Sequence, residues 1–541
     1  MRHGRSTQWF LWAILLLHLG LSLAYGVVVP LSEAPDELSH YDYVRLVVRE
    51  RRLPVATEVG EAIQPPLYYI LGAALAWPIP MDLDFARSNP AFRLHDPDAP
   101  QNLFVHGRAE TFPYRGSALA FHLVRALSAV LSTLTVWAVY RGLLLLARGD
   151  QVAALGGAGF LAFVPEFCYL GGAAQNDNLA ALLAACLLWR LLALVRGRGD
   201  WAAWAQVGVL LGLGLLAKLS LVAFLPLVGL VAAWRAWRMR GSGLARSAAM
   251  EAARLGGALA LAAAIAGWWY VRNVRLYGDP LGWALIRRAV DLQRCPWTRE
   301  GVWWMLRGLF ESFWGRFGGA AHVRLPLWAY LLAAGFSAVA LVGAARGLLS
   351  WWRAGRPGWA EAAGWGLVVL WLGMVGASLV RYTLTAQGTN QARLLYPALL
   401  PLVGVLWMGF LHWFPRRRWP WVGGGVAGLL ALANLALLAW FLPAHYGVPR
   451  PPAPMEASLP AEPLAVFGGE IALLEARLEP QEVDAQGQVE VRLVWQALTD
   501  IQEDYRVSLW VQGPPGVPPW VVKGAPAGGR HPTDLWHAAQ V

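Results

Sequence analysis

The sequence is nearly without lysine and has little charge of either sign. Lys218 and Lys523 are the only lysines, so Arg supplies the other 43 of the 45 basic residues. Charged residues make up 15% of the 541 positions and hydrophobic residues 57%, which excludes an ordinary soluble protein of this length. The net charge of +11 does not indicate nucleic-acid binding, because the Arg residues stand in short groups between apolar runs. The composition predicts a polytopic membrane protein.

Cysteine is scarce as well, and the three cysteines have no spacing typical of a metal site. Cys168 and Cys186 fall in or beside apolar segments, and Cys295 lies in a predicted loop. No structural disulfide is therefore expected.

Apolar runs follow one another through the first 443 residues. They predict eleven helices, at about 8–30, 117–140, 151–171, 178–195, 203–217, 219–234, 255–271, 325–345, 363–381, 395–413 and 420–443. The first is expected to remain uncleaved, because its apolar run is long and the cleavage site after it is poor. Around Lys218, two short helices or one long kinked helix fit the sequence, and the first is favoured because it preserves the alternation of basic loops.

Arg residues cluster in every second connection, as the positive-inside rule expects. The basic connections follow residues 140, 195, 234, 345 and 413, which places the N terminus in the cytoplasm. The connections 31–116, 171–177, 272–324 and 382–394 then lie outside. We expect an integral, multi-pass protein of the plasma (inner) membrane, in contact with membrane lipids.

The composition changes after residue 443. Residues 444–464 are rich in Pro and indicate a linker. Within 465–541, EIALLEARL, QVEVRLVWQA and DYRVSLWVQ alternate apolar and polar residues, which predicts antiparallel strands. The predicted fold class is an all-α membrane core over 1–443 with a small extracytoplasmic β-sandwich-like domain. Only four or five strands are visible, so the completeness of that sheet stays open.

Three carboxylates stand at the start of the first outer loop (31–116), in SEAPDELSHYDYVR. Glu33, Asp36 and Glu37 precede HYDYVRLVVRERRLP, whose spacing of apolar and Arg residues predicts an amphipathic helix in the membrane interface. A carboxylate held there can accept a proton from a hydroxyl. Adjacent acids can also raise one pKa or hold a divalent metal. The alternative is an ordinary solvated loop.

Other polar residues at the predicted outer ends of helices are candidates for the walls of a site: His40, Tyr68, Tyr69, Gln175, Asn176 and Asp177. Interface anchoring by the tyrosines is the plainer alternative for the second interfacial helix, near residues 64–75. Helix capping is the alternative for Asn176 and Asp177.

Three basic residues on the outer side are candidates for binding a lipid-linked phosphate. Lys218 ends a short helix, and Arg393 begins another. Arg272 is predicted on the outer side, where the positive-inside rule expects few basic residues. An ammonium or a guanidinium in such a place can bind phosphate. Snorkelling to the interface or contact with lipid headgroups is the alternative for each.

Taken in order, PDE, PPLYY, QNDNLAAL, LAKLS, RNVRLYGDPLG, SFWGRFG and ARLLYP resemble the GT-C superfamily of membrane glycosyltransferases. The nearest resemblance is to its bacterial branch of protein O-mannosyltransferase-like and aminoarabinose-transferase-like enzymes, over about residues 8–440. It implies a helical core with two juxtamembrane helices in the first outer loop. It also implies a sugar donor on polyprenyl phosphate and a glycan, lipid or protein acceptor outside.

The resemblance further implies roles for single residues. Asp36 would be the base that activates the acceptor hydroxyl, with Glu37 as the alternative, and the anomeric carbon would invert. By their charge and predicted side, and not by a family motif, Lys218 and Arg393 would balance the leaving phosphate, and Arg272 is a further candidate for binding the donor phosphate. A divalent metal stays open, with Asp36, Glu37 and Asp177 as its candidate ligands, and no other cofactor is expected.

The predicted function is therefore an inverting hexosyl- or pentosyltransferase of the cell envelope. The alternative is a non-enzymatic transporter or flippase of lipid-linked glycans, which would place charges at mid-membrane and show two related halves. No internal repeat is visible in the sequence.

Overall fold

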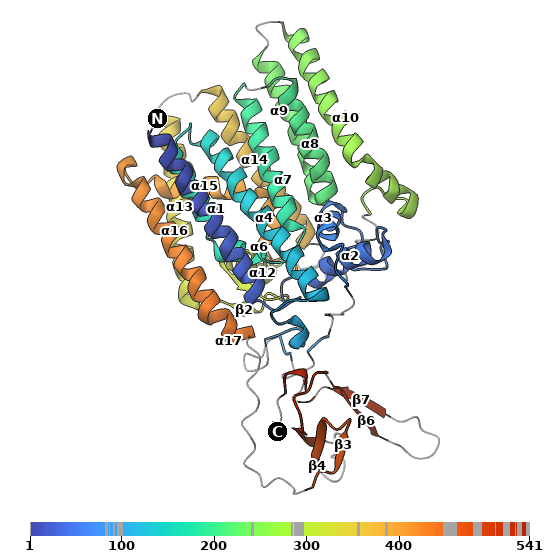
Figure 1. Cartoon of the computed structure of the whole chain (residues 1–541). Helices are drawn as coiled ribbons and strands as arrows, with labels where there is room; N and C mark the ends of the chain where they lie inside the picture. Colours follow the sequence, from blue (N-terminus) through green and yellow to red (C-terminus); the bar gives the residue numbers. More distant parts are fainter. Residues whose placement is uncertain are drawn as a thin grey trace.

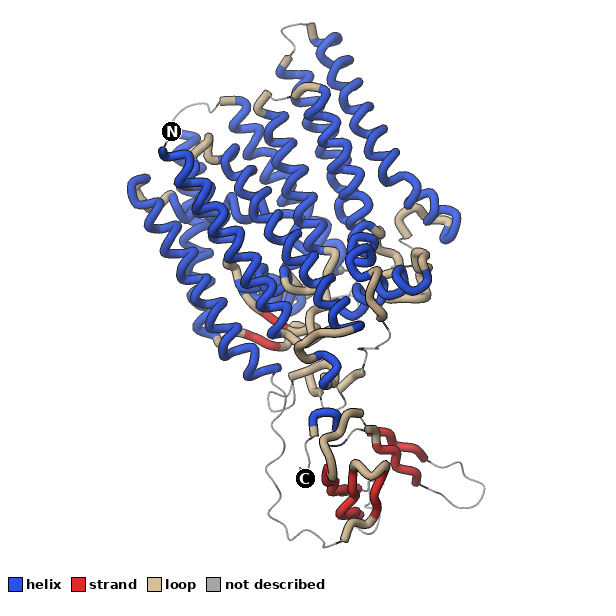
Figure 2. Tube along the Cα trace, viewed as in Figure 1, coloured by secondary structure: helices blue, strands red, loops and turns tan. Residues whose placement is uncertain are grey.

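The computed structural model is a bundle of long helices with a group of strands beyond one end (Figures 1 and 2). It describes residues 2–81, 85, 87–89, 92–94, 101–197, 199–239, 243–282, 285, 297–353, 358–384, 388–446, 462–479, 490–503, 505–511, 520–524, 526 and 533–536. Figure 1 shows the N terminus at the end of the bundle opposite to the strands β3–β7.

The α-helices of the described residues cover the predicted apolar segments and extend most of them, and α12 lies in a stretch that was predicted as a connection. They are α1 (Arg2–Val28), α2 (Glu37–Glu50), α3 (Leu67–Ala76), α4 (Gly116–Leu146), α5 (Gln151–Ala162), α6 (Pro165–Gly171), α7 (Asp177–Val195), α8 (Trp201–Ala217), α9 (Phe224–Arg238), α10 (Leu244–Tyr277), α12 (Arg299–Trp314), α13 (Leu327–Arg353), α14 (Trp359–Thr383), α15 (Leu399–Leu411), α16 (Trp419–Ala436) and α17 (Leu442–Tyr446). Helices α5, α8 and α12 are capped at their first turns. The side chains of Asp150, Asp200 and Thr298 accept hydrogen bonds there from backbone amides that have no partner within the helix.

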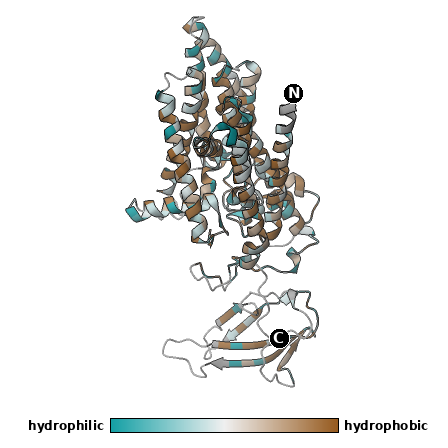
Figure 3. Ribbon diagram, turned by 90° about the vertical axis from the view of Figure 1, so that its left-hand side faces the viewer, coloured by the Kyte–Doolittle hydropathy of each residue, from teal (hydrophilic) through white to brown (hydrophobic). Residues whose placement is uncertain are grey.

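Nine helices among the described residues are long and apolar enough to cross a membrane. The pair α5 and α6, bent by 66°, is a tenth if it forms one span. The eleventh predicted segment is α8, whose 17 residues make a shorter apolar helix. Large apolar side chains of the bundle also stay exposed, among them Leu331, Leu429 and Trp421. Figure 3 shows hydrophobic residues along the length of the bundle helices. The protein is therefore an integral, multi-pass membrane protein.

The break at Lys218 confirms the interpretation of two short helices. Helix α8 ends at Ala217, Lys218 is extended, and the 3₁₀ helix η2 (Leu219–Ala223) leads into α9. Irregular backbone at the end of a span leaves the Lys218 side chain free to turn toward neighbouring loops.

The first outer loop contributes the two expected juxtamembrane helices, α2 and α3. Their aromatic faces pack together and against the bundle, with ring centroids 3.7 Å apart for Tyr43 and Tyr69 and 4.1 Å apart for Tyr41 and Phe121. These contacts hold α2 and α3 together and fix the beginning of α2 to α4.

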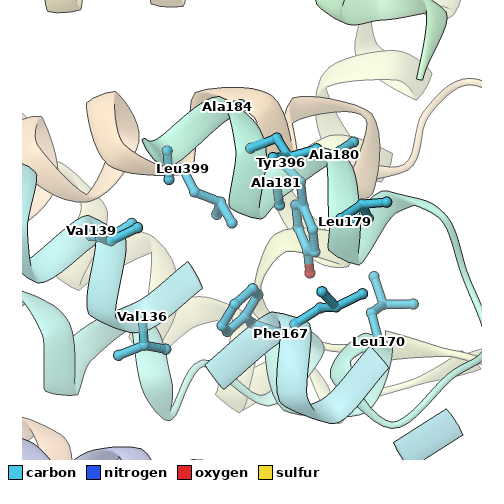
Figure 4. Packing of buried hydrophobic residues seen from close by; sticks show 14 of the residues in the cluster. Val136, Val139, Phe167, Leu170, Leu179, Ala180, Ala181, Ala184, Tyr396 and Leu399 are labelled. Atoms are coloured by element: carbon cyan, nitrogen blue, oxygen red, sulfur yellow. The ribbon is translucent and has the colours of Figure 1, made fainter. Parts of the chain in front are cut away.

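The core of the bundle lies between α4, α6, α7, α15 and the 3₁₀ helix η4 (Ala392–Ala398) (Figure 4). Its buried side chains include Val136, Val139, Phe167, Leu170, Leu179, Ala180, Ala181, Ala184, Tyr396 and Leu399. Small residues bring other helices close: a Cβ added to Gly343 of α13 would lie 2.0 Å from the Gly409 carbonyl oxygen of α15. This packing fixes the ends of α7 and η4 relative to each other.

The described strands after residue 464 confirm the predicted antiparallel pattern. Strands β3 (Ala465–Phe467), β4 (Ile471–Glu479) and β5 (Glu490–Ala497) form one sheet in that order, and β6 (Val507–Val511) pairs with β7 (Trp520–Gly524). A short ribbon, β1 (Arg316–Phe317) with β2 (Val323–Arg324), follows α12. The predicted linker, 444–464, lies mostly outside the described residues, as does Cys295.

The strand-bearing part touches the first outer loop. The Arg108 amide donates to Asp534 Oδ2 at 2.7 Å, and Arg108 Nη1 donates to Gln502 Oε1 at 3.1 Å. A Cβ added to Gly107 would lie 2.6 Å from Asp534 Oδ2, so only glycine permits this approach without a shift.

Candidate active site

Asp36 lies at the turn between α1 and α2, directly before the first residue of α2. Its φ of 57° is in the left-handed region, which Asp tolerates better than most residues. The carboxylate is 51% exposed, and its Oδ2 accepts a hydrogen bond from Arg393 Nη2. Asp36 is thus an exposed acid with one cationic partner.

Arg393 reaches this position from the start of η4, more than 350 residues further along the chain. Its three nitrogens have separate partners. Nη2 meets Asp36, Nη1 lies 3.4 Å from Asp177 Oδ2, and Nε donates to Gln391 Oε1 at 2.7 Å. The guanidinium therefore bridges the acids of the first and second outer loops.

Asp177 is the first residue of α7, and its side chain is only 3% exposed. Lys218 Nζ donates to its Oδ1 from the break after α8. Neither Asp177 nor Asn176 uses its side chain to cap the helix. Four residues of alternating charge thus form one chain of contacts, Asp36–Arg393–Asp177–Lys218, which we name the charge cluster.

The charge cluster keeps Asp36 ionised. The Arg393 guanidinium outweighs the effect of partial burial and lowers the pKa of Asp36 to about 2. Asp36 is therefore a carboxylate at any physiological pH, available as a hydrogen-bond acceptor but weakly basic while Arg393 holds it.

Glu37 follows Asp36 in the sequence but has a different environment. Its side chain is fully buried, and Arg125 of α4 donates to both carboxylate oxygens, at 2.8 and 2.7 Å. The amides of Ser32 and Ala174 donate to the same two oxygens. Glu37 thereby ties the first outer loop to the second, and its oxygens face protein donors on every side.

Glu33 is also buried and holds the loop in a similar way. It accepts from the amides of Leu103 and Phe104, at 3.0 and 2.9 Å, and pairs with His106 Nε2 at 2.9 Å. Burial opposes protonation of His106, but Glu110 and Glu33 outweigh it and raise the pKa of His106 to about 9. Glu33 is thus an anchor for residues 103–106.

The candidate wall residues of α2 and α3 lie buried beside the charge cluster. His40 Nδ1 and the Tyr69 hydroxyl share a hydrogen bond of 2.9 Å, and burial lowers the pKa of His40, which favours the neutral ring. The Tyr68 hydroxyl shares a hydrogen bond of 2.8 Å with Ser128 of α4.

The amide side chains before α7 connect the two outer loops. Gln175 Nε2 donates to the Pro35 carbonyl at 2.5 Å, directly before Asp36, and Asn176 Nδ2 lies 3.5 Å from Gln64 Oε1. Among the residues that the structure describes, the buried side-chain carbonyl oxygens of Gln175 and Asn176 have no hydrogen-bond partner. Such acceptors beside a charged site suit hydroxyl groups or ordered water.

Arg272 is not part of the charge cluster. Its Nη2 donates to the carbonyls of Pro54, at 2.7 Å, and Leu53, and its guanidinium lies over the Trp269 ring. Within the described residues, no hydrogen bond or ion pair joins it to Asp36, Asp177, Lys218 or Arg393. It fastens the end of the α2 segment to α10 (Leu244–Tyr277).

The three carboxylates considered for a metal do not form a set of metal ligands. Arg125 donates hydrogen bonds to the carboxylate of Glu37. Arg393 lies between Asp36 and Asp177 and contacts one oxygen of each, and Lys218 donates to the other oxygen of Asp177. Within the described ranges, no group of three His, Cys, Asp or Glu side chains has a geometry for a metal ion. The donor set fits an anion better than a cation.

Three structurally important residues were not among the sequence candidates. They are Arg125, Gln391 and Glu166, whose Oε2 accepts from the Arg316 amide at 2.8 Å. Arg125 and Glu166 stand within predicted apolar helices, where a charged residue is itself a signal of function or structure. The partner of Glu37 was therefore detectable in principle. Gln391, which orients Arg393, is an uncharged loop residue without a comparable signal.

Residues 111–295 match the family model described as dolichyl-phosphate-mannose-protein mannosyltransferase. Over that part of the chain, this match confirms the resemblance to the GT-C superfamily. No curated protein matches the sequence.

The chain is also similar, at low identity, to parts of three solved structures. ArnT from Cupriavidus metallidurans, bound to undecaprenyl phosphate, has 17% identity and a TM-score of 0.45, covering 79% of this chain and 64% of that one. The Archaeoglobus fulgidus oligosaccharyltransferase with Zn and sulfate has 14% identity and a TM-score of 0.44, covering 80% and 53%. The S. cerevisiae Pmt1-Pmt2 complex with its sugar donor has 19% identity and a TM-score of 0.38, covering 51% and 34%. In each case the chain spans less than two thirds of the known protein.

Proposed function

We propose that the protein is a membrane glycosyltransferase that moves a hexose or pentose from polyprenyl phosphate to a hydroxyl of a glycan, lipid or protein. The observation that carries the proposal is the charge cluster, in which a half-exposed carboxylate stands beside two cations at the end of a membrane bundle. The family model that matches residues 111–295 is described as a dolichyl-phosphate-mannose-protein mannosyltransferase. This description, which names a lipid-phosphate-linked sugar, supports the same chemistry.

The reaction needs a base on one side of the sugar and cations on the other. The acceptor oxygen attacks the anomeric carbon from the face opposite the phosphate, and its proton passes to Asp36. The bond from the anomeric carbon to the phosphate oxygen breaks, and its electron pair leaves with the phosphate. This displacement inverts the anomeric centre. Lys218 and Arg393 stabilise the charge that develops on the phosphate.

Asp36 rather than Glu37 is assigned as the base. Its carboxylate is exposed to an incoming hydroxyl, whereas both oxygens of Glu37 are buried and accept hydrogen bonds from Arg125 and two amides. A base must come within hydrogen-bond reach of the proton that it removes. Glu37 is assigned to holding the loop that carries Asp36.

The topology that goes with this function places the charge cluster outside the cytoplasm, in the plasma (inner) membrane. The Arg-rich connections support a cytoplasmic N terminus. The chain divides into a catalytic core over 1–443 and an extracytoplasmic β domain over 465–541, whose strands β3–β7 lie beyond the bundle end opposite the N terminus (Figure 1).

The test uses purified full-length protein in nanodiscs with labelled polyprenyl-phosphate sugars. Release of polyprenyl phosphate and transfer of label to an acceptor are expected, and Asp36→Asn should reduce both about 100-fold or more. Asp42→Asn in the adjoining helix α2 is the matched control, because Asp42 pairs with Arg45 instead. Normal turnover of Asp36→Asn would refute the base assignment. Movement of the lipid between leaflets without bond cleavage would favour the flippase.

A further inference from the structure

We infer that Arg393 exchanges Asp36 for the donor phosphate, so that binding of the donor itself releases the catalytic base. This inference rests on the proposed function and assigns a second role to Arg393. Arg393 would both hold the leaving group and couple its arrival to the activation of Asp36.

The starting point is that both cations of the charge cluster already have anionic partners. Lys218 is paired with Asp177, and Arg393 with Asp36 and Asp177. An arriving phosphate must therefore displace a carboxylate or leave the two cations unused. Charge-assisted hydrogen bonds to phosphate are strong enough to compete with those to a carboxylate.

The two carboxylates are not equally easy to displace. Asp177 is 3% exposed and contacts two cations, so displacing it from either one would remove a partner from a buried carboxylate that water does not reach. Asp36 is 51% exposed, and water can solvate its carboxylate as soon as the guanidinium leaves it. The phosphate is therefore expected to replace Asp36.

The geometry of Arg393 permits this exchange without turning the side chain. Gln391 accepts from Nε, and Asp177 Oδ2 lies 3.4 Å from Nη1. Two of the three guanidinium nitrogens therefore have partners other than Asp36. Only Nη2 points to Asp36. A phosphate oxygen at Nη2 would keep the other two contacts in place, and the rigid fork of the guanidinium would position it.

The exchange changes Asp36 from a held carboxylate into a base. While Arg393 donates to Oδ2, this oxygen is occupied and the guanidinium holds the pKa of Asp36 near 2. Removal of that partner, and the arrival of a negative phosphate nearby, both increase the affinity of Asp36 for a proton. The acceptor hydroxyl is thus deprotonated only when a donor is present.

The experiment measures binding of polyprenyl monophosphate, without sugar, to the full-length protein in nanodiscs. If Asp36 competes for Arg393, Asp36→Asn should bind this lipid more tightly, on the order of tenfold. Asp42→Asn makes the same change in charge in the adjoining helix α2, and its affinity should stay within about twofold of that of the unmodified protein. Equal or weaker binding by Asp36→Asn overturns the inference. So does an equal gain by Asp42→Asn, which would indicate general electrostatics.

A double-mutant cycle tests whether the gain passes through Arg393. In an Arg393→Gln background, Asp36→Asn should no longer increase the affinity, and a persisting gain overturns the inference. Asp36→Gly, which suits the φ of 57°, is a second variant with the same expected gain should Asp36→Asn not fold. Because no sugar is present, loss of the proposed function would appear as absent transfer, while the binding result stands independently.

Discussion

Arg125 donates to both carboxylate oxygens of Glu37, and its remaining donors go to the backbone carbonyls of Gly26, Val29 and Pro30 at 2.7 to 2.8 Å. This buried pair joins the end of α1, the first turn of α2 and the middle part of α4. It fixes the turn on which Asp36 stands, so the position of the exposed acid depends on a buried one.

Glu37→Gln should destabilise the protein strongly, because it leaves the Arg125 guanidinium buried with an uncharged partner. Breaking a buried ion pair on one side costs about 3–5 kcal/mol. The apparent unfolding temperature in detergent measures this loss. Glu50→Gln, at an exposed pair with Arg52, should have almost no effect. Equal unfolding temperatures for the two variants would contradict the role assigned to Glu37.

Arg393→Lys should lower the turnover of the labelled donor by about 10- to 100-fold, although the charge is kept. A single ammonium group cannot contact Asp36, Asp177 and Gln391 in the fixed fork that the guanidinium provides. The rate of polyprenyl phosphate release measures the effect. Arg275→Lys, on the exposed face of α10, serves as the control, and a loss of similar size there would argue against a specific role for Arg393.

Arg272→Gln should leave the affinity for polyprenyl monophosphate within about twofold of that of the unmodified protein. Arg272 is engaged by the carbonyls of Leu53 and Pro54 and does not contact the charge cluster. The nanodisc binding measurement decides between this expectation and a role in phosphate binding. A tenfold or larger loss of affinity would restore Arg272 to the phosphate site.

The contact between Glu33 and His106 should depend on pH. The pKa of His106 is raised from 6.5 to about 9 in the folded protein. Its stabilising effect is therefore complete below about pH 6.5 and is lost as the pH rises through about 9. The difference in unfolding temperature between the unmodified protein and His106→Gln should shrink between pH 6.5 and 9.5. A difference that is constant over this range would contradict the ion pair.

Gly107→Ala should loosen the strand-bearing part from the first outer loop. The added Cβ would lie 2.6 Å from Asp534 Oδ2, which accepts from the Arg108 amide. Hydrogen exchange at Arg108 should accelerate, and Asp534→Ala should produce the same change. Gly424→Ala in α16, where a Cβ meets no atom within 4 Å, is the control. Unchanged protection of Arg108 in Gly107→Ala would show that the contact does not hold this amide.

Much of the helical bundle was predictable because its signal is local. A run of apolar residues must form a helix in a membrane to satisfy its backbone, wherever the rest of the chain lies. The break at Lys218 and the start of α3 were predictable because a charge or a Pro pair interrupts an apolar pattern, and α2 was predictable from its amphipathic spacing of apolar and Arg residues. The bend between α5 and α6 was not predicted, although Pro165 begins α6.

The sequence by itself determined the apolar spans, the alternating strands after residue 464, and the placing of acids and bases at helix ends. Only the tertiary structure decided their partners. Asp36 and Glu37 are adjacent, yet Asp36 stands before α2 in the left-handed conformation and Glu37 is the first residue of the helix, so one faces solvent and Arg393 while the other faces Arg125. Charge pairing acts through space between residues hundreds of positions apart, and no local pattern encodes it.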